Sequence, residues 1–167
     1  ERDFNPKYLS NYLSALISQN SKDSVSYFNS SKILINEHAI FLEKYVKALT
    51  VSGQIQKSIN IIKQNRGKEN SKFFEAELLL LIDNFKKKKF KQNLKLLDEF
   101  QKYREYGNFN YIIYEVLKSY NDLFLKKEFN SNIKDFGKLS LINEVFQYCY
   151  LDKAGTNSKF LNLINSK

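Results

Sequence analysis

The stretch EHAIFLEKYVKALTVSGQIQKSINIIKQNR, residues 37–66, carries the pattern of two amphipathic helices joined by a short turn. Apolar residues recur at three- and four-residue steps in both halves, which is the spacing of helices that bury one face. Between the halves stand Ser52 and Gly53, and glycine adopts without steric cost the positive φ that ends a helix. The stretch therefore predicts an αα-hairpin. Its apolar residues are Ile40, Phe41, Tyr45, Val46, Leu49, Ile55, Ile59, Ile61 and Ile62.

The rest of the chain shows the same helical pattern. Asn5 and Pro6 predict a helix start, because asparagine caps free N–H groups and proline has a helical φ. All five glycines lie between the periodic segments, as expected when glycine costs about 1 kcal/mol inside a helix. No segment alternates apolar and polar residues as a strand does, so we expect an all-α fold. Further helices are predicted at residues 6–19, 23–35, 71–87, 90–104, 109–127, 138–153 and 158–165, with a short, weak one at 129–136.

The apolar stripes assign most large side chains to the core. The 25 aromatic residues are expected mainly to fill space between helices. The alternative is that aromatic residues interleaved with lysines stack single-stranded bases. Cys149, inside the predicted helix 138–153, is expected to be a buried small apolar residue. On the helix 6–19 the residues expected to point inward are Tyr8, Leu9, Tyr12, Leu13, Leu16 and Ile17.

A step of 34 or 35 residues relates the second helices of successive hairpins. The matching patterns are Ser24-x-x-x-Phe28, Ser58-x-x-x-Ile62 and Asn93-x-x-x-Leu97. One hairpin cannot bury its apolar face alone, so neighbouring hairpins stack. We therefore expect a right-handed αα-superhelix of about four to five hairpins with a concave inner surface, forming a single domain over residues 1–167.

These residues resemble the tetratricopeptide repeat family. Gly53 matches its turn glycine, Ser58 its small residue at the helix crossing, and Ile62 the large residue that follows. Ser24, Phe28 and Ser31 match the equivalent positions one repeat earlier. The chain departs from the family at Tyr12 and Val46, where a glycine or alanine is usual, and in having no proline that closes a repeat. It looks more specifically like the divergent tetratricopeptide proteins of alphaproteobacteria, some of which are exported.

The resemblance implies a scaffold that holds a peptide or a partner helix in its concave face. In the family this groove is lined by exposed positions of each first helix. Those positions correspond to Glu43, Lys47 and Thr50 in the stretch 37–66. We expect these three residues to contact a protein partner.

A formal net charge of +9 raises the question of an anionic partner. Lysine outnumbers arginine 24 to 3, and arginine is the residue that makes bidentate phosphate and base contacts. Nucleic acid is therefore an unlikely partner. The run Lys86–Lys89, extended by Lys91, has two interpretations, with Lys87 and Lys88 as its candidate contacts. It is a basic loop that binds an acidic partner, nucleic acid or anionic lipid, or a solvated turn favoured by the field of a helix C-terminus.

The sequence contains no recognisable catalytic or metal-binding constellation, so we expect no enzyme activity, metal or cofactor. His38 is the only histidine and has no partner for metal binding or base catalysis, so it is expected to be exposed or stacked on a neighbour. The carboxylates Glu75 and Glu77 point to different sides of a helix and are expected to be solvated. The chain has no initiator Met and ends inside a predicted helix, which suggests a piece of a longer protein. Flanking segments would then decide between a cytoplasmic or periplasmic location and between a soluble or membrane-associated state.

Overall fold

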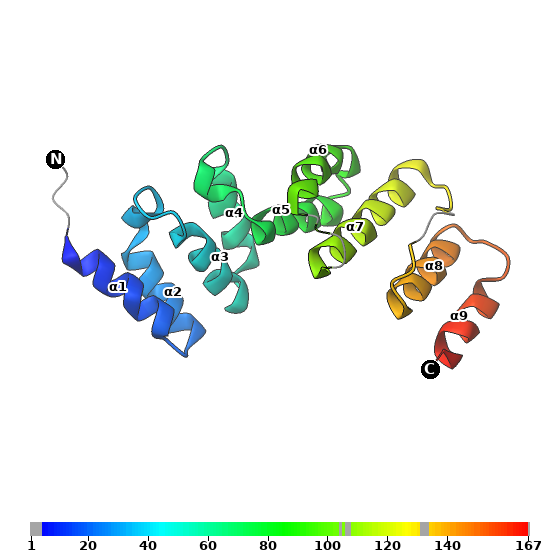
Figure 1. Cartoon of the computed structure of the whole chain (residues 1–167), viewed down its shortest axis with the longest axis horizontal. Helices are drawn as coiled ribbons and strands as arrows, with labels where there is room; N and C mark the ends of the chain where they lie inside the picture. The colour runs from blue at the N-terminus through cyan, green and yellow to red at the C-terminus, as the bar shows by residue number, and fades with distance from the viewer. Residues whose placement is uncertain (1–4, 104, 106–107, 131–133, 167) are drawn as a thin grey trace. The chain divides into compact units, whose positions relative to one another are not determined.

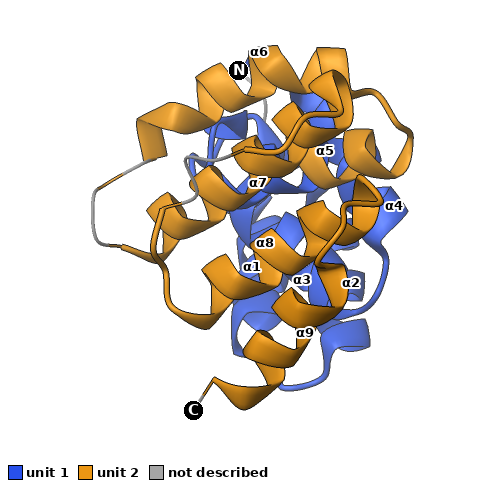
Figure 2. Cartoon of the chain, turned by 90° about the vertical axis from the view of Figure 1, so that its right-hand side faces the viewer, with its two compact units in different colours: residues 1–80 blue, residues 81–167 orange. Residues whose placement is uncertain are grey.

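The structure, a computed structural model, describes residues 5–103, 105, 108–130 and 134–166. Within these residues all regular secondary structure is helical (Figure 1), which confirms the predicted all-α class. The chain divides into two compact units, residues 1–80 and 81–167 (Figure 2). The α-helices are α1 Pro6–Ile17, α2 Ser21–Ser30, α3 Phe41–Val51, α4 Ile55–Asn65, α5 Phe74–Lys86, α6 Phe90–Phe100, α7 Phe109–Lys126, α8 Lys138–Tyr150 and α9 Thr156–Asn165, with 3-10 turns η1 Lys32–Ile35, η2 Glu69–Ser71 and η3 Gln101–Tyr103.

Several helix boundaries differ from the predicted ones because short side chains bond to local carbonyls. The helix predicted at 23–35 is broken after α2, where Ser31 Oγ donates to the Tyr27 carbonyl at 2.9 Å. Ser71 does not cap α5. Its hydroxyl donates to the Lys68 carbonyl at 2.7 Å within η2, and α5 begins at Phe74. Serine competes with helical hydrogen bonding in this way wherever its hydroxyl reaches a nearby carbonyl. Arg104, the predicted end of the helix that starts at Phe90, lies outside the described residues.

Asparagine side chains start three of the helices. Asn5 Oδ1 accepts the Lys7 N–H at 3.0 Å with Pro6 at the first helical position, which confirms the predicted start of α1. Asn20 caps α2 by the same contact with Lys22, and Asn108 caps α7. Each cap satisfies one of the N–H groups that a helix leaves without an internal partner.

The turn between α3 and α4 is a Schellman motif. Gly53 has a φ of 78°, and its N–H donates to the Thr50 carbonyl at 3.0 Å while the Gln54 N–H donates to the Leu49 carbonyl at 2.8 Å. This pair of bonds satisfies the last carbonyls of α3. Gly53 therefore acts as the predicted turn residue.

Two later turns repeat this geometry without glycine. Lys88 has a φ of 56° and Asp152 a φ of 51°. The N–H groups of Lys89 and Lys153, which follow them, donate five residues back, to Asn84 at 2.8 Å and to Tyr148 at 3.0 Å. The turns before α4 and α6 thus share one hydrogen-bond pattern at a 35-residue step. The left-handed conformation at Lys88 and Asp152 carries the steric cost that a Cβ atom imposes.

Four aromatic rings form the core of unit 1 where α1, α2 and α3 meet. The Phe28 ring lies 5.3 Å from Phe41 and 5.5 Å from Tyr45, and Tyr12 lies 5.3 Å from Phe41. All four rings are buried. Tyr45 Oη donates to Asn29 Oδ1 at 2.6 Å, and burial raises the pKa of Tyr45 to about 12.

The residues of the 34- to 35-residue step share burial, and the two serines among them also share a bond to the facing backbone. Ser24, Ser58 and Asn93 are all buried on the second helix of a hairpin. Ser24 Oγ donates to the Ala15 carbonyl at 2.8 Å, and Ser58 Oγ lies 3.3 Å from the Val46 carbonyl. A small side chain that bonds to the facing backbone lets two helices approach closely. The fold is therefore helical and repeat-like at these positions.

In unit 2, α6 and α7 run antiparallel with two asparagines between two ring pairs. Phe90 stacks on Phe124 with ring centroids 4.9 Å apart, and Phe100 stacks on Tyr114 at 6.3 Å. Asn93 and Asn121 occupy corresponding places on the two helices. Each asparagine is three residues from its helix's ring in the first pair and seven residues from its ring in the second pair. Both are fully buried, and neither amide has a hydrogen-bond partner among the described residues.

A polar network and a non-helical segment connect α7 to α8. Asn143 and Gln147 of α8 both donate to Ser119 Oγ of α7, at 3.2 and 3.3 Å. Gln147 Oε1 accepts the Asn130 N–H at 2.9 Å, so this segment bonds to a side chain instead of forming a helix. The helix predicted at 129–136 is wrong for residues 129–130 and 134–136, while residues 131–133 lie outside the described residues.

Replacing Lys88 or Asp152 by glycine should stabilise the protein. Each change relieves a left-handed conformation that glycine adopts freely, and we expect the free energy of unfolding to rise by about 0.5–1 kcal/mol for each. Urea denaturation followed by circular dichroism measures the change. Lys95→Gly is the control, because Lys95 is exposed inside α6 and glycine in a helix interior should only destabilise. A loss of stability in both Lys88→Gly and Asp152→Gly would contradict this account of the turns.

Replacing the buried asparagine pair by apolar residues should also stabilise unit 2. A buried amide without a partner costs about 1–3 kcal/mol, and Asn93→Ala with Asn121→Leu nearly preserves the combined volume. We expect the double variant to unfold at higher urea, by about 1–3 kcal/mol. Ser119→Ala is the control: it removes the acceptor of a bonded network and should destabilise. A less stable double variant would mean that the amides are satisfied in solution, for example by buried water.

Candidate functional site

The exposed side of α1 is apolar. Leu9, Leu13, Leu16 and Ile17 are 39%, 52%, 45% and 80% exposed, so the prediction that they point inward is wrong. The buried residues of α1 are Tyr12 and Ala15, because only that stripe of the helix faces α2 and α3. Exposed leucines at spacings of three and four residues form one continuous strip along a helix.

The leucine strip occupies the same repeat positions as the predicted contact residues of α3. Leu9, Leu13 and Leu16 precede Glu43, Lys47 and Thr50 by 34 residues, the step that separates Ser24 from Ser58. The Tyr12 and Phe41 rings are 5.3 Å apart, so α1 and α3 adjoin. We call Leu9, Leu13, Leu16, Glu43 and Lys47 the first-helix face. Sequence reasoning missed its α1 half, although the 34-residue step applied to Glu43, Lys47 and Thr50 would have found it.

The three predicted contact residues have different environments. Lys47 is exposed, and Glu43 is partly exposed. Thr50 is less available, because its Oγ1 donates to the Val46 carbonyl at 2.8 Å and lies 3.2 Å from Ser58 Oγ. Thr50 therefore belongs to the crossing of α3 and α4. Contact with a partner stays a prediction for all three residues.

Lys44 is the electrostatic centre of this region. Its Nζ donates to Glu43 Oε1 at 3.0 Å. That hydrogen bond, and next the charge of Glu43, raise the pKa of Lys44, with smaller contributions from Tyr12 and Glu75. Groups from α1, α3 and the start of α5 thus interact around one ammonium. Burial raises the pKa of Tyr12, and the charge of Lys44 opposes that rise.

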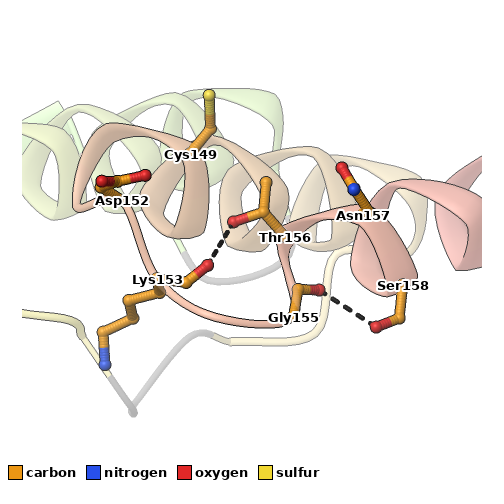
Figure 3. A pocket seen from close by; sticks show the side chains of 7 residues that line it. All are labelled: Cys149, Asp152, Lys153, Gly155, Thr156, Asn157 and Ser158. Atoms are coloured by element: carbon orange, nitrogen blue, oxygen red, sulfur yellow. Dashed lines mark hydrogen bonds between the residues drawn. The ribbon is translucent and has the colours of Figure 1, made fainter.

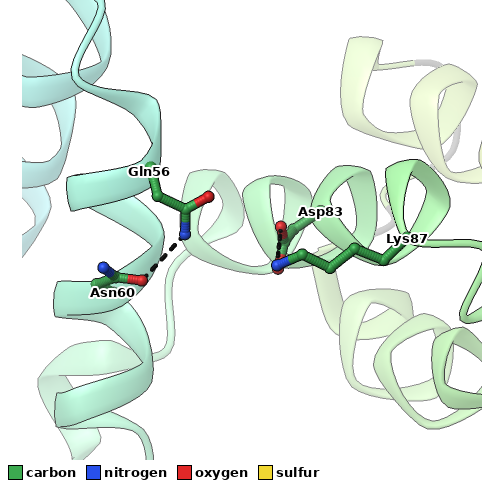
Figure 4. Close-up of polar contacts among 4 residues, drawn as sticks. All are labelled: Gln56, Asn60, Asp83 and Lys87. Atoms are coloured by element: carbon green, nitrogen blue, oxygen red, sulfur yellow. Dashed lines mark hydrogen bonds and ion pairs between the residues drawn. The ribbon is translucent and has the colours of Figure 1, made fainter.

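The lysine run forms the exposed turn between α5 and α6. Lys86, Lys87, Lys88, Lys89 and Lys91, here called the basic turn, are all exposed. Lys87 Nζ lies 2.6 Å from Asp83 Oδ1, a buried carboxylate one helical turn earlier (Figure 4). The figure also shows the bond between Gln56 and Asn60 on α4 of unit 1. The charge of Lys87 is thus already paired, while Lys88 holds the left-handed position of the turn.

Six aromatic rings lie together in unit 2, four of them partly buried and two exposed. Phe124 on α7 is their centre and contacts the other five at centroid distances between 4.9 and 6.5 Å. None of the six is buried, and Phe146 and Tyr150 are 40% and 42% exposed. The prediction that aromatic residues mainly fill space between helices holds for the four rings of unit 1, whereas here the rings also pack between helices but Phe146 and Tyr150 stay exposed. The aromatic surface consists of Phe85, Phe90, Tyr120, Phe124, Phe146 and Tyr150.

The helix α8 packs through its polar side and exposes its apolar side. Its buried residues are Asn143 and Gln147, which bond to Ser119 of α7. Its large apolar side chains stay exposed because they lie on the other faces of the helix: Leu139, Ile142, Phe146 and Tyr150. An exposed apolar patch of this kind marks an interaction site in many soluble proteins.

A hollow of about 400 Å³ lies at the turn between α8 and α9 (Figure 3). Its two hydroxyl side chains bond locally, Thr156 to the Lys153 carbonyl at 2.7 Å and Ser158 to the Gly155 carbonyl at 3.2 Å. Cys149 at its edge is exposed, so the prediction of a buried cysteine is wrong. Cys149 stands two positions after buried Gln147, which places it on another side of α8. The other lining residues are Asp152, Lys153 and Asn157.

The remaining titratable candidates are His38, Glu75 and Glu77. The His38 ring packs on the Tyr12 ring with centroids 4.9 Å apart, so of the two predicted environments, exposed or packed on a neighbour, the second is observed. Glu75 is exposed as predicted, but Glu77 is buried with Arg66 Nη2 3.8 Å from its Oε2, so the solvated prediction is wrong for Glu77. Among the described residues no group of three or more histidine, cysteine or carboxylate side chains is arranged to hold a metal ion.

Comparison of the chain with protein-family models, curated proteins and solved structures found no match. In the part of the chain that the structure describes, none of the helices has the length and apolarity needed to cross a membrane.

Phe124 should be the residue on which the aromatic surface depends for stability. Because its ring contacts the other five but is itself only partly buried, Phe124→Ala should lower the free energy of unfolding by about 1–3 kcal/mol, less than the loss of a core phenylalanine. Phe146→Ala removes a ring that is 40% exposed and should cost less than half as much. Parallel urea titrations of the two variants give the comparison. Equal losses would show that Phe124 is not the centre of the packing.

Proposed function

We propose that this chain is a protein-interaction scaffold of the tetratricopeptide-like type, in which the first-helix face of unit 1 holds a peptide or a partner helix. One observation carries the proposal: the exposed leucines of α1 stand 34 residues before Glu43, Lys47 and Thr50. Two successive first helices thus present outward the two repeat positions that hold Leu9 and Leu13 in α1 and Glu43 and Lys47 in α3. Such alignment is the feature by which helical repeats form an extended binding surface.

The burial pattern supports a repeat underlying this surface. Tyr12 and Val46 are both buried, and one residue further along each helix Leu13 and Lys47 are both exposed. The same alternation between a packed and an accessible side is what the resemblance to tetratricopeptide repeats implies. We extend it to the proposal that the hairpins stack as a right-handed superhelix and that the first-helix positions line its concave side.

The chemistry of the face suits an amphipathic ligand. Leu9, Leu13 and Leu16 offer apolar side chains at helical spacing, which can receive the apolar anchors of a partner helix. Glu43 and Lys47 flank them with charges of both signs and add specificity more than affinity. Thr50, whose hydroxyl bonds inside the hairpin, serves to hold the face in shape.

The alternative is binding of nucleic acid or an anionic lipid surface through the basic turn. Its support is the exposure of five lysines within residues 86–91. The pairing of Lys87 with Asp83 reduces that support. Unit 2 also contains one arginine in its sequence, Arg104, so bidentate phosphate contacts are scarce.

Selection from a displayed library of random 16-residue peptides tests the proposal. Peptides enriched on the native chain should lose affinity by at least about tenfold on Leu9→Ser/Leu13→Ser, because burial of two leucines supplies more than the roughly 1.4 kcal/mol that a factor of ten requires. The charge swap Glu43→Lys/Lys47→Glu should select a different set of peptides.

The matched control is Ile33→Ser/Ile55→Ser, which removes two isoleucines of unit 1 that are 43% and 40% exposed. It should leave the affinity of the selected peptides unchanged. Peptides that bind both serine variants as well as the native chain would exclude the first-helix face as the binding site.

A further inference from the structure

We propose that unit 2 carries a second docking surface, made of the aromatic surface and the basic turn at its edge, which binds an acidic amphipathic helix of a partner protein. The inference rests on the proposed function of the chain as a scaffold. It uses none of the residues of the first-helix face, so the two can be tested separately.

The aromatic surface contrasts with the ring cluster of unit 1. Tyr12, Phe28, Phe41 and Tyr45 also contact one another, yet each is at most 3% exposed. In unit 2 six rings make equally close contacts and none of them is buried. Large exposed aromatic patches are costly in a soluble protein and concentrate binding energy when a partner covers them.

The packing of α8 explains why these rings are exposed. Asn143 and Gln147 each donate to Ser119 Oγ, at 3.2 and 3.3 Å, and Gln147 also donates to Asn143 Oδ1 at 3.2 Å within α8. A helix with Ile142 and Phe146 on one side would ordinarily bury that side against its neighbour. Here the network occupies the buried stripe of α8, and Phe146 and Tyr150 contact α7 only at its edge, so that 40% and 42% of these residues stay exposed.

Helical spacing on both sides gives the surface its shape. Tyr120 and Phe124 are four residues apart on α7, and Phe146 and Tyr150 are four residues apart on α8. Their rings contact across the two helices, at 5.1 Å for Tyr120 and Phe146 and at 5.0 Å for Phe124 and Tyr150. Two adjoining helices with apolar rows match the i, i+3, i+4, i+7 anchors of a third helix.

The positive charge of the basic turn, at the edge of the aromatic surface, indicates that the partner is negatively charged. Phe85 and Phe90 immediately flank the lysines of the basic turn, so the turn adjoins the rings. Residues 81–167 contain 16 lysines and arginines against 10 aspartates and glutamates. Acidic side chains on the polar flank of the docked helix would meet this excess of positive charge.

The ring arrangement favours a protein over single-stranded nucleic acid. Base stacking needs ring faces that are open to solvent. Phe124 instead contacts five rings, and three of those contacts are edge-to-face, with Phe85, Phe146 and Tyr150. A closely packed patch of this type offers an apolar surface rather than separate platforms.

The test uses the same displayed library of 16-residue peptides against the full chain. Enriched peptides should combine Leu, Ile or Phe at helical spacing with Asp or Glu on the flanks. Phe146→Ser/Tyr150→Ser, which removes two exposed rings, should lower the affinity for these peptides by at least about tenfold. Lys89→Glu/Lys91→Glu should lower the affinity for these peptides by about fivefold or more at low salt, and the loss should be smaller at high salt.

The control Lys22→Glu/Lys32→Glu changes two exposed lysines of unit 1 and should alter affinity by less than about twofold, as expected for surface charges outside the site. Lys22 in α2 and Lys91 in α6 both stand at the second helical position, so glutamate is tolerated equally there. Circular dichroism of each variant verifies that it is folded.

Three results would overturn the inference: enriched peptides that are basic, equal binding to the native chain and to Phe146→Ser/Tyr150→Ser, or no enrichment. Displacement of the peptides by oligo-dT of 20 nucleotides or by phosphatidylserine vesicles, lost in Lys89→Glu/Lys91→Glu, would assign the surface to an anionic polymer or membrane and also overturn it. Peptides whose binding is weakened only by Leu9→Ser/Leu13→Ser would uphold the proposed function and refute the second surface. Peptides whose binding is weakened only by Phe146→Ser/Tyr150→Ser would uphold the second surface and count against the proposed function.

Discussion

Phe28 packs between Phe41 and Tyr45, with ring centroids 5.3 and 5.5 Å away, and this contact holds α2 against α3. It is the point at which one hairpin of unit 1 meets the next. Small residues at the crossings, Ser24 and Ser58, bond to the facing backbone and let the helices approach. Because α1 and α3 use their inner stripes for this packing, their other sides stay accessible. The exposed leucines and charges of the first-helix face follow from that geometry.

Periodicity predicted which residues could share a helical face, but it could not predict whether another element covers that face. The hairpin at residues 37–66 was predicted correctly in both helices and in its glycine turn, since all three signals are local. Leu13 and Cys149 were placed wrongly because their burial depends on neighbours that are distant in sequence. The turns at Lys88 and Asp152 show a related limit: their geometry equals that of Gly53, yet no glycine marks it.

The candidate sites were predictable to different degrees. Glu43 and Lys47 were named from the repeat position and do lie on the accessible side of α3, whereas the α1 leucines required the same step to be applied backwards. The aromatic surface was assigned to the core, since phenylalanine at helical spacing is buried in most proteins. One signal was present in the sequence: Phe85 and Phe90 enclose the lysine run, and the pairs Tyr120 with Phe124 and Phe146 with Tyr150 repeat a four-residue spacing.

The buried polar residues of unit 2 explain why the aromatic surface persists. Turning α8 so that Phe146 and Tyr150 faced inward would gain about 1–3 kcal/mol for each buried side chain. The same rotation would expose or break the bonds that join Asn143, Gln147 and Ser119, and would release the Asn130 N–H from Gln147. Each of these polar groups that stayed buried without a partner would cost about 1–3 kcal/mol, which offsets the gain from burying the two rings. The apolar side of α8 is then free to bind a partner without any change in how the helix packs.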